Sequence, residues 1–449
     1  MKRNLLWLAL FAILYFGLRA PDLITPLHYE EGAFGEIFYA QPPNPNYILL
    51  GRIDGINLYS SPEHPAIIYE ILSHYGQLWK VLVNYQTLNV VALTFIVRLA
   101  FSIFQFLVAG VILLMILLWR DSVSWRDKIT LLAWISVLVV TPPAMTISTS
   151  VQVDGSVGTL LAGLLAIALL GHRLELYPLR TASVLVLITS LLFGFGKNEW
   201  SLALLLALLS TTGYLYLTTR KRRASKNYNP AWRLLGLILA GLLLGNLVSY
   251  LYDKGNYLAG FDVMFRISKA SNYNFISFGI ERLAFAYVNL LLLAFIAVAL
   301  IRAWKSVDYI LFLYFSLGAI LFLAYFVTSW AIEPRYYAAS LSLCLAGTVV
   351  AYEHLAGAKT RWLMLGISFV LLAVTGNQMV QNKHRMRLYL QLELQKSRNE
   401  QITTIPPGCI PTLGLGEAFG QEIDFISNSL SPEGAADLVA KYNRIICKP

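Results

Sequence analysis

The sequence predicts an all-α polytopic membrane protein built from about eleven transmembrane helices. Hydrophobic residues make up 57% of the 449 residues and charged residues only 13%, and the mean hydropathy is +0.61. This composition is too apolar for a soluble globular protein of such length. The net charge of +10 comes from Lys and Arg in short clusters between apolar runs. Because that pattern orients helices in a membrane, we expect no nucleic-acid partner.

Apolar runs long enough to cross a bilayer, or nearly so when tilted, supply the expected helices. They fall at roughly 4–20, 97–119, 129–147, 156–171, 181–196, 200–219, 234–252, 284–303, 308–329, 336–356 and 361–377. The first run ends at Leu18-Arg19-Ala20-Pro21. This is a poor signal-cleavage site, because no small residue precedes Ala20 by two positions and Pro21 follows it. We therefore expect a retained first helix.

Lys and Arg collect in alternate connections, which gives a consistent topology. With the N-terminus inside, the basic connections at 120–128, 173–180, 220–233, 302–305 and 359–361 are all cytoplasmic, and the C-terminus is outside. The outer face then holds the loop 21–96, the connection 141–155, the turn 194–200, the loop 252–283 and the link 329–337. These outer segments carry the polar clusters, so we expect any chemistry there. They contain no Asn-x-Ser/Thr acceptor, which favours a bacterial inner membrane.

The composition divides the chain into two parts. Residues 1–377 form the expected transmembrane catalytic domain, and residues 378–449 form a small extracytoplasmic module that opens with an amphipathic segment. Cys409 and Cys447 lie on the oxidising side of this topology, so we predict a disulfide between them. Cys344 lies within an apolar run and is expected to be an inert packing thiol.

An acidic pair follows the first apolar run. Glu30 and Glu31 would be costly at a membrane boundary unless they face water, a cation or a polar cavity. In an extended segment neighbouring side chains point different ways, so one carboxylate can take a proton from a hydroxyl while the other holds a second partner. The alternative interpretation is a pair of solvated loop acids.

Five cations lie at or near the expected outer helix ends, where they could neutralise a phosphate at head-group level. They are Lys197, Lys254, Arg266, Arg282 and Arg335. An Arg or Lys at a helix end is more often a snorkelling anchor than a ligand-binding residue. Lys197 and Arg335 depart from that expectation. Lys197 follows two glycines in an apolar run, and Arg335 follows a helix-breaking proline.

Five short motifs occur in order between about residues 25 and 345. They are Tyr29-Glu30-Glu31-Gly32-Ala33-Phe34-Gly35, Glu63-His64-Pro65, Asp154-Gly155 at the start of an apolar run, Phe195-Gly196-Lys197, and Pro334-Arg335-Tyr336-Tyr337. The set resembles the GT-C superfamily of membrane glycosyltransferases, most closely its protein O-mannosyltransferase and lipid A aminoarabinose transferase branches. The chain departs from the family pattern in having Glu-Glu for Asp-Glu, Ala66 for the second proline of the loop motif, and a short C-terminal module. These departures leave open which acid is the base, which sugar is moved and which acceptor receives it.

The resemblance implies a GT-C-like bundle that transfers a sugar from a polyprenyl-phosphate donor to an outer-face acceptor with inversion. By motif position Glu30 would be the general base, with Glu31 second. His64, Glu63 and Asp154 would position the acceptor or its loop. Lys197 and Arg335 would hold the donor phosphate, with Arg266 and Arg282 as weaker candidates. Because two or three cations can neutralise one phosphate, we expect no metal or other cofactor.

Three other functions fit a chain of this class. A transporter or lipid flippase would need charged or broken helices near the bilayer midplane and usually two similar halves. A polymerase or ligase of cell-surface polysaccharide typically carries its large loop late in the chain, whereas the richest loop here follows the first helix. A membrane scaffold would present the C-terminal module, which is slight for so many helices. The acceptor of a transferase could be a glycan, a lipid or a protein.

Overall fold

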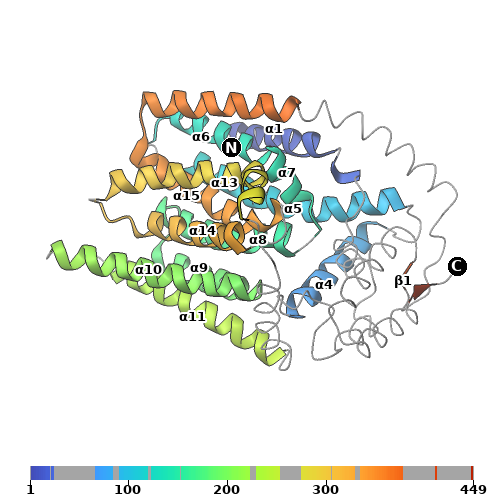
Figure 1. Ribbon diagram of the computed structural model, residues 1–449, viewed down its shortest axis with the longest axis horizontal. Helices are drawn as coiled ribbons and strands as arrows, with labels where there is room; N and C mark the ends of the chain where they lie inside the picture. Colours follow the sequence, from blue (N-terminus) through green and yellow to red (C-terminus); the bar gives the residue numbers. More distant parts are fainter. Residues whose placement is uncertain are drawn as a thin grey trace.

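The protein is described by a computed structural model whose described residues are almost entirely helical. They are 2–20, 22–24, 66–83, 90–119, 123–151, 153–222, 229–252, 275–304, 306–328, 334–377, 410–411 and 446–447. Most of the helices run side by side along the long axis of the molecule (Figure 1). In chain order the elements are α1 (Lys2–Arg19), η1 (Asp22–Ile24), α4 (Ala66–Leu82), α5 (Val90–Leu118), α6 (Trp125–Val139), α7 (Pro142–Thr149), η3 (Val153–Val157), α8 (Gly158–Arg173), α9 (Leu179–Phe193), α10 (Asn198–Arg222), α11 (Asn229–Tyr252), α13 (Phe275–Ala303), α14 (Tyr309–Thr328), η4 (Pro334–Tyr337), α15 (Ala338–Leu355) and a last helix, Ala358–Asn377.

Eight of the described helices are long and apolar enough to cross a membrane, which identifies an integral membrane protein. The helices α6 and α7 would add a ninth span if counted together, but they are bent by 64° at their junction. The bend falls at Thr141-Pro142-Pro143, where proline cannot continue the hydrogen bonds of α6. The helices α1 and α9 are apolar but shorter. Every expected apolar run is therefore helical, and the count of eleven spans stays a prediction.

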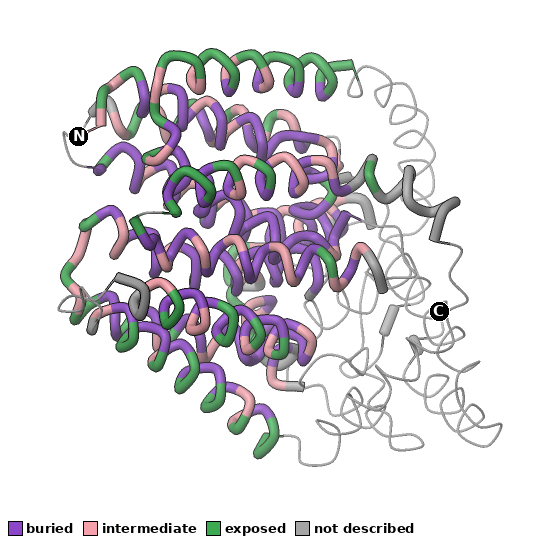
Figure 2. Tube along the Cα trace, turned by 60° about the vertical axis from the view of Figure 1, so that its left-hand side comes forward, coloured by how far each residue is buried: buried purple, intermediate pink, exposed green. Residues whose placement is uncertain are grey.

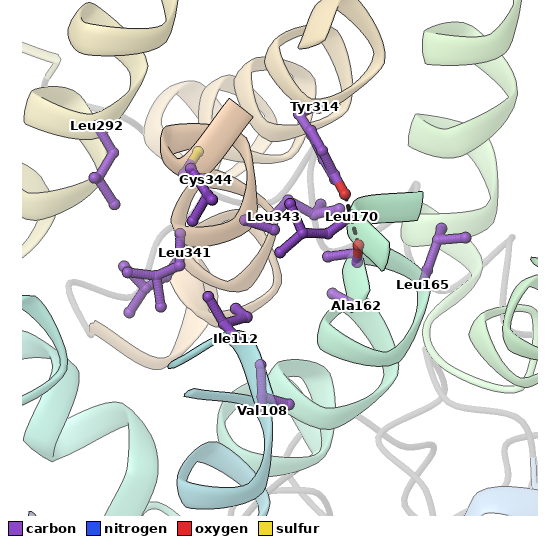
Figure 3. Close-up of a cluster of buried hydrophobic side chains, with 14 of the residues drawn as sticks. Val108, Ile112, Ala162, Leu165, Leu170, Leu292, Tyr314, Leu341, Leu343 and Cys344 are labelled. Carbon is purple, nitrogen blue, oxygen red and sulfur yellow. Dashed lines mark hydrogen bonds between the residues drawn. The ribbon is translucent and has the colours of Figure 1, made fainter. Parts of the chain in front are cut away.

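The centre of the bundle is α15, which is buried along nearly all of its length. It packs against α8, α13 and α14. Figure 3 shows Leu341, Leu343 and Cys344 of α15 among side chains from α5, α8 and α13. Cys344 is a buried free thiol, as expected. Tyr314 of α14 donates a hydrogen bond to the Ala166 carbonyl of α8 at 2.6 Å, which joins two neighbours of α15.

The helices at the periphery expose apolar side chains outward. Figure 2 shows buried residues concentrated in the central helices and exposed ones along the outer sides of the others. Leu243 and Leu247 of α11 are 60% and 51% exposed, and Trp362 and Phe369 of the last helix are each 75% exposed. Apolar surface of this extent is stable only against lipid or another apolar partner.

The pair α9 and α11 is in especially close contact. A Cβ atom built on Gly245 would lie 2.3 Å from the Leu191 carbonyl oxygen, and one on Gly241 would lie 2.5 Å from that of Leu187. Only glycine permits this approach, as in other small-residue contacts between membrane helices. The pairing brings the turn that follows α9 against α11.

One end of the bundle gathers η1, α7, η3 and η4 with the start of α10. The other end carries a charged cluster formed by the last residues of α8 and α15 and the first of α14. There Arg173 lies 3.0 Å from Asp308 and 2.6 Å from Glu353, and His354 contacts Asp308 at 3.1 Å. Since α8 and α15 each run from the first end to the second, the two polar regions lie about 25 Å apart by helix length.

Asp308 is the centre of the second cluster. Burial acts to raise the pKa of its carboxyl, but the hydrogen bond with His354 and the charge of Arg173 outweigh it, so the pKa lies below its ordinary value. The Leu311 amide also donates to Asp308 at 3.0 Å, which caps α14. The cluster therefore holds three helix ends together.

Within the expected C-terminal module, residues 378–449, the described residues form one short strand pairing. The strands β1 (Ile410–Pro411) and β2 (Ile446–Cys447) are parallel, with Pro411 opposite Cys447. Cys409 lies outside the described residues, so the disulfide with Cys447 stays a prediction.

Candidate functional site

The end that holds η1, α7, η3 and η4 contains three of the residues singled out from the sequence. They are Asp154, Lys197 and Arg335, which come from three separate segments. The other site residues named from the sequence are not placed. Glu30, Glu31, Glu63, His64 and Arg266 lie outside the described residues, as does Lys254, and Arg282 lies in α13 with its side chain outside them.

Lys197 is a buried cation at the start of α10. Its side chain is 2% exposed, and its ammonium lies 2.9 Å from Asp154 Oδ1. The preceding turn folds back tightly, because a Cβ atom on Gly196 would come within 2.4 Å of the Trp200 ring. A charge buried this deeply requires a counter-ion. The ion pair with Asp154 therefore fixes where α10 begins relative to η3.

Asp154 lies in a single π-helical turn at the head of α8. Such turns insert a residue into a helix and occur often at functional sites. A Cβ atom on Gly155 would lie 2.8 Å from Ser150 Cβ, so only glycine fits the adjacent position. The Ser156 hydroxyl donates to the Ser148 carbonyl at 3.0 Å. These contacts hold η3 against α7 and direct the Asp154 carboxylate toward Lys197.

Arg335 is the second buried cation of this end, with 4% of the residue exposed. Its guanidinium carbon lies 4.9 Å from the centre of the Tyr336 ring, and Nη2 donates to the Tyr336 hydroxyl at 3.1 Å. The Lys197 ammonium lies 5.5 Å from the centre of the same ring. Both cations are thus within cation–π range of one aromatic residue.

A hydrogen-bonded chain beside the cations was not foreseen from the sequence. The Tyr325 hydroxyl donates to Glu199 Oε2 at 2.7 Å and accepts from Trp200 Nε1 at 3.0 Å. Tyr325 also stacks on Tyr336 with ring centres 5.3 Å apart. Glu199 and Trp200 belong to the same turn as Lys197, and this proximity in the sequence could have identified them as candidate site residues. Tyr325 is one aromatic among many in an apolar helix, and nothing in the sequence distinguishes it.

A third buried cation fixes α7. Arg19 is fully buried and donates to Gln105 Oε1 at 2.6 Å and to the Ser148 hydroxyl at 2.7 Å. Arg98 donates to the Thr149 carbonyl at 2.6 Å. The two arginines thus join α1 and α5 to the C-terminal half of α7, the helix that precedes η3. We predicted no role for Arg19 from the sequence beyond its place at the end of the first helix.

An acid accompanies these arginines. Asp22 of η1 is partly buried, and burial raises the pKa of its carboxyl, while the charges of Arg19 and Arg98 act in the opposite direction.

Lys197 and Arg335 lie near the Tyr336 ring, and two carboxylates, Asp154 and Glu199, lie at the same end. Lysine and arginine side chains are the groups that bind phosphate and other anions in proteins, so these two cations could contact such a ligand. Among the described residues, no three His, Cys, Asp or Glu side chains come together in a way that could hold a metal ion. No family model, curated protein or solved structure matches this chain.

Proposed function

We propose that this protein is an inverting glycosyltransferase that moves a sugar from a polyprenyl-phosphate donor to an acceptor hydroxyl at the outer face of a bacterial inner membrane. The N-terminus would be cytoplasmic and the C-terminus outside. The observation that carries the proposal is the burial of Lys197 and Arg335, both close to the Tyr336 ring. Their positions match two motifs that resemble the GT-C superfamily, and ionisable residues buried in a membrane protein are costly and often mark a functional site.

The chemistry assigned to these residues is charge stabilisation. When the acceptor hydroxyl attacks the anomeric carbon, the bond to the lipid phosphate breaks and negative charge accumulates on that phosphate. Lys197 and Arg335 would bind this leaving group, as fixed cations do in other transfer reactions. Asp154 would keep Lys197 charged and directed toward the phosphate. Glu30, with Glu31 as the second candidate, would take the proton from the hydroxyl.

The first test separates donor binding from chemistry. The full chain is reconstituted in vesicles, and sugar transfer and binding of a polyprenyl phosphate are measured for Lys197→Met and Arg335→Met. We expect each to reduce transfer by about a hundred- to a thousand-fold, as removal of a stabilising donor does elsewhere, and to weaken lipid-phosphate binding. Lys359→Met is the control, because Lys359 is exposed near the opposite end. Unchanged binding and transfer in both variants would exclude the cation assignment.

The second test concerns the base and the metal. Glu30→Gln and Glu31→Gln are made separately, and we expect one of them to abolish transfer while lipid-phosphate binding persists. Full activity in both would exclude a base in this pair. Chelation should leave transfer unchanged, and loss restored by manganese or magnesium would contradict the expected metal independence. Movement of the lipid-linked sugar across the bilayer without a covalent product would identify a flippase instead.

A further inference from the structure

Tyr325 contacts both of the segments that carry the buried cations Lys197 and Arg335. It belongs to α14 and is 5% exposed. The helix α14 packs along α10 and also contacts η4, so a side chain near the end of α14 can reach the two segments together. The proposed glycosyl transfer assigns no role to this tyrosine.

The hydroxyl of Tyr325 fixes the first turn of α10. It accepts a hydrogen bond from Trp200 Nε1 at 3.0 Å and donates one to Glu199 Oε2 at 2.7 Å. Trp200 is 1% exposed, so its indole N–H is shielded from water and needs this partner. The backbone amides of Trp200 and Ser201 donate to the Lys197 carbonyl at 3.0 and 3.3 Å. The position of this turn therefore also sets the position of Lys197.

The ring of Tyr325 contacts the other segment. It stacks on the Tyr336 ring, with ring centres 5.3 Å apart and an angle of 29° between the planes. Tyr336 follows Arg335 in η4, and its hydroxyl accepts from Arg335 Nη2 at 3.1 Å. The Lys197 ammonium lies 5.8 Å from the centre of the Tyr325 ring and 5.5 Å from that of Tyr336. One side chain of α14 therefore holds both cation-bearing segments, through different groups.

The distance between the two cations affects transfer if both contact one phosphate. In the proposed reaction that phosphate gains negative charge as the sugar leaves, and cations already held in place stabilise the charge without reorganising. A displacement of about 1 Å can cost about a hundred-fold in rate. Contacts that hold the two cations in place therefore contribute more to the transition state than to binding of the intact donor.

We propose that Tyr325 is a positioning residue that sets the spacing between Lys197 and Arg335 around the donor phosphate. It acts through the two cations: its hydroxyl through the first turn of α10, and its ring through Tyr336. This inference rests on the proposed glycosyl transfer. It adds that the two groups of the side chain have separable effects, because phenylalanine keeps the ring and removes only the hydroxyl.

The first measurement is the kinetics of transfer by the full chain in vesicles. Tyr325→Phe should lower kcat by about tenfold and Tyr325→Leu by about a hundred-fold, with the donor KM changed by less than about threefold in each. The control is Tyr314→Phe. Tyr314 lies about three turns earlier in α14, is fully buried, and donates a comparable hydrogen bond to the Ala166 carbonyl (Figure 3). This variant should leave kcat and KM unchanged.

The second measurement is independent of transfer. A small amine-acylating reagent is added to the full chain, and the rate at which it modifies Lys197 is followed by mass spectrometry of the peptide. Lys197 is 2% exposed and paired with Asp154, so the native rate should be slow. Tyr325→Leu should raise this rate several-fold, because the ammonium loses the ring that helps to hold it, whereas Tyr314→Phe should not.

The inference requires both results. It is overturned by an unchanged kcat in both Tyr325 variants, by a rise in donor KM with kcat unchanged, or by an equal fall in kcat in Tyr314→Phe. An unchanged Lys197 rate in Tyr325→Leu also overturns it, because the cation would not have moved. If Tyr325→Leu does not fold, Tyr325→Phe is used for both measurements. If the native chain transfers no sugar, the proposed function fails, and the Lys197 rates alone decide whether Tyr325 positions that cation.

Discussion

The contact between Lys197 and Asp154 predicts strong thermodynamic coupling. The ammonium and the carboxylate are 2.9 Å apart, with side chains 2% and 11% exposed. Removing one member of such a pair leaves an uncompensated buried charge, which costs about 3 to 5 kcal/mol. Lys197→Met and Asp154→Asn should therefore each raise the equilibrium constant for unfolding. The increase is roughly a hundred- to a few thousand-fold, at about 1.4 kcal/mol per factor of ten.

The double variant tests whether Lys197 and Asp154 stabilise the protein as a pair or independently of each other. With both charges removed, neither side chain is left as a buried ion. The double variant should therefore lose several kcal/mol less unfolding free energy than the two single variants lose in sum. Equilibrium unfolding in mixed micelles with increasing denaturing detergent, followed by tryptophan fluorescence, measures each free energy. Lys359→Met should stay within about 0.5 kcal/mol of the native protein. Additive losses in the double variant would refute the pairing.

Three further predictions concern the polar chain, the opposite end and the close helix pair. Tyr325→Phe removes the hydroxyl that donates to Glu199 and should cost about 1.5 to 3 kcal/mol in the same unfolding assay; an unchanged midpoint would contradict it. Asp308 has a lowered pKa, so its stabilising effect is present above its unfolded pKa of about 3.9 and is lost as pH falls through the lower native value. Asp308→Asn should remove that part of the acid dependence, and an unaltered acid profile would be inconsistent with it. Gly245→Ala forces a methyl group toward a backbone carbonyl of α9 and should cost about 1 to 3 kcal/mol, whereas Gly236→Ala, with nothing within 4 Å, should be neutral or stabilising by up to about 1 kcal/mol.

Hydropathy predicted the helices well because it depends on local composition. Each expected run is helical, including the run 129–147, where the structure adds a 64° bend. The sequence indicated that bend only through Pro142 and Pro143. The alternation of basic and polar connections also anticipated that Asp154, Lys197 and Arg335 would come to one end of the bundle, because consecutive membrane helices run in opposite directions.

The contacts among those residues could not be read from the sequence. That Lys197 pairs with Asp154, and that it shares the Tyr336 ring with Arg335, depends on which helices pack together. The same holds for Tyr325, whose hydroxyl meets Glu199 across a separation of 126 residues. Apolar helices in a membrane carry no periodic signal that selects their neighbours, since lipid and protein are similarly apolar surroundings.

The sequence by itself determined that this chain is a membrane protein and where its apolar helices lie. It also identified Lys197 and Arg335 as cations whose placement beside apolar segments costs free energy, which made them candidate site residues. These properties follow from the free energy of moving side chains between water and lipid, residue by residue. Tertiary structure decided the ion pair of Lys197, the aromatic ring that lies near both cations and the role of Arg19 as an anchor for α7. These depend on the close packing of α15 with its neighbours and on the glycine contacts of α9 with α11, which place distant segments within hydrogen-bond distance.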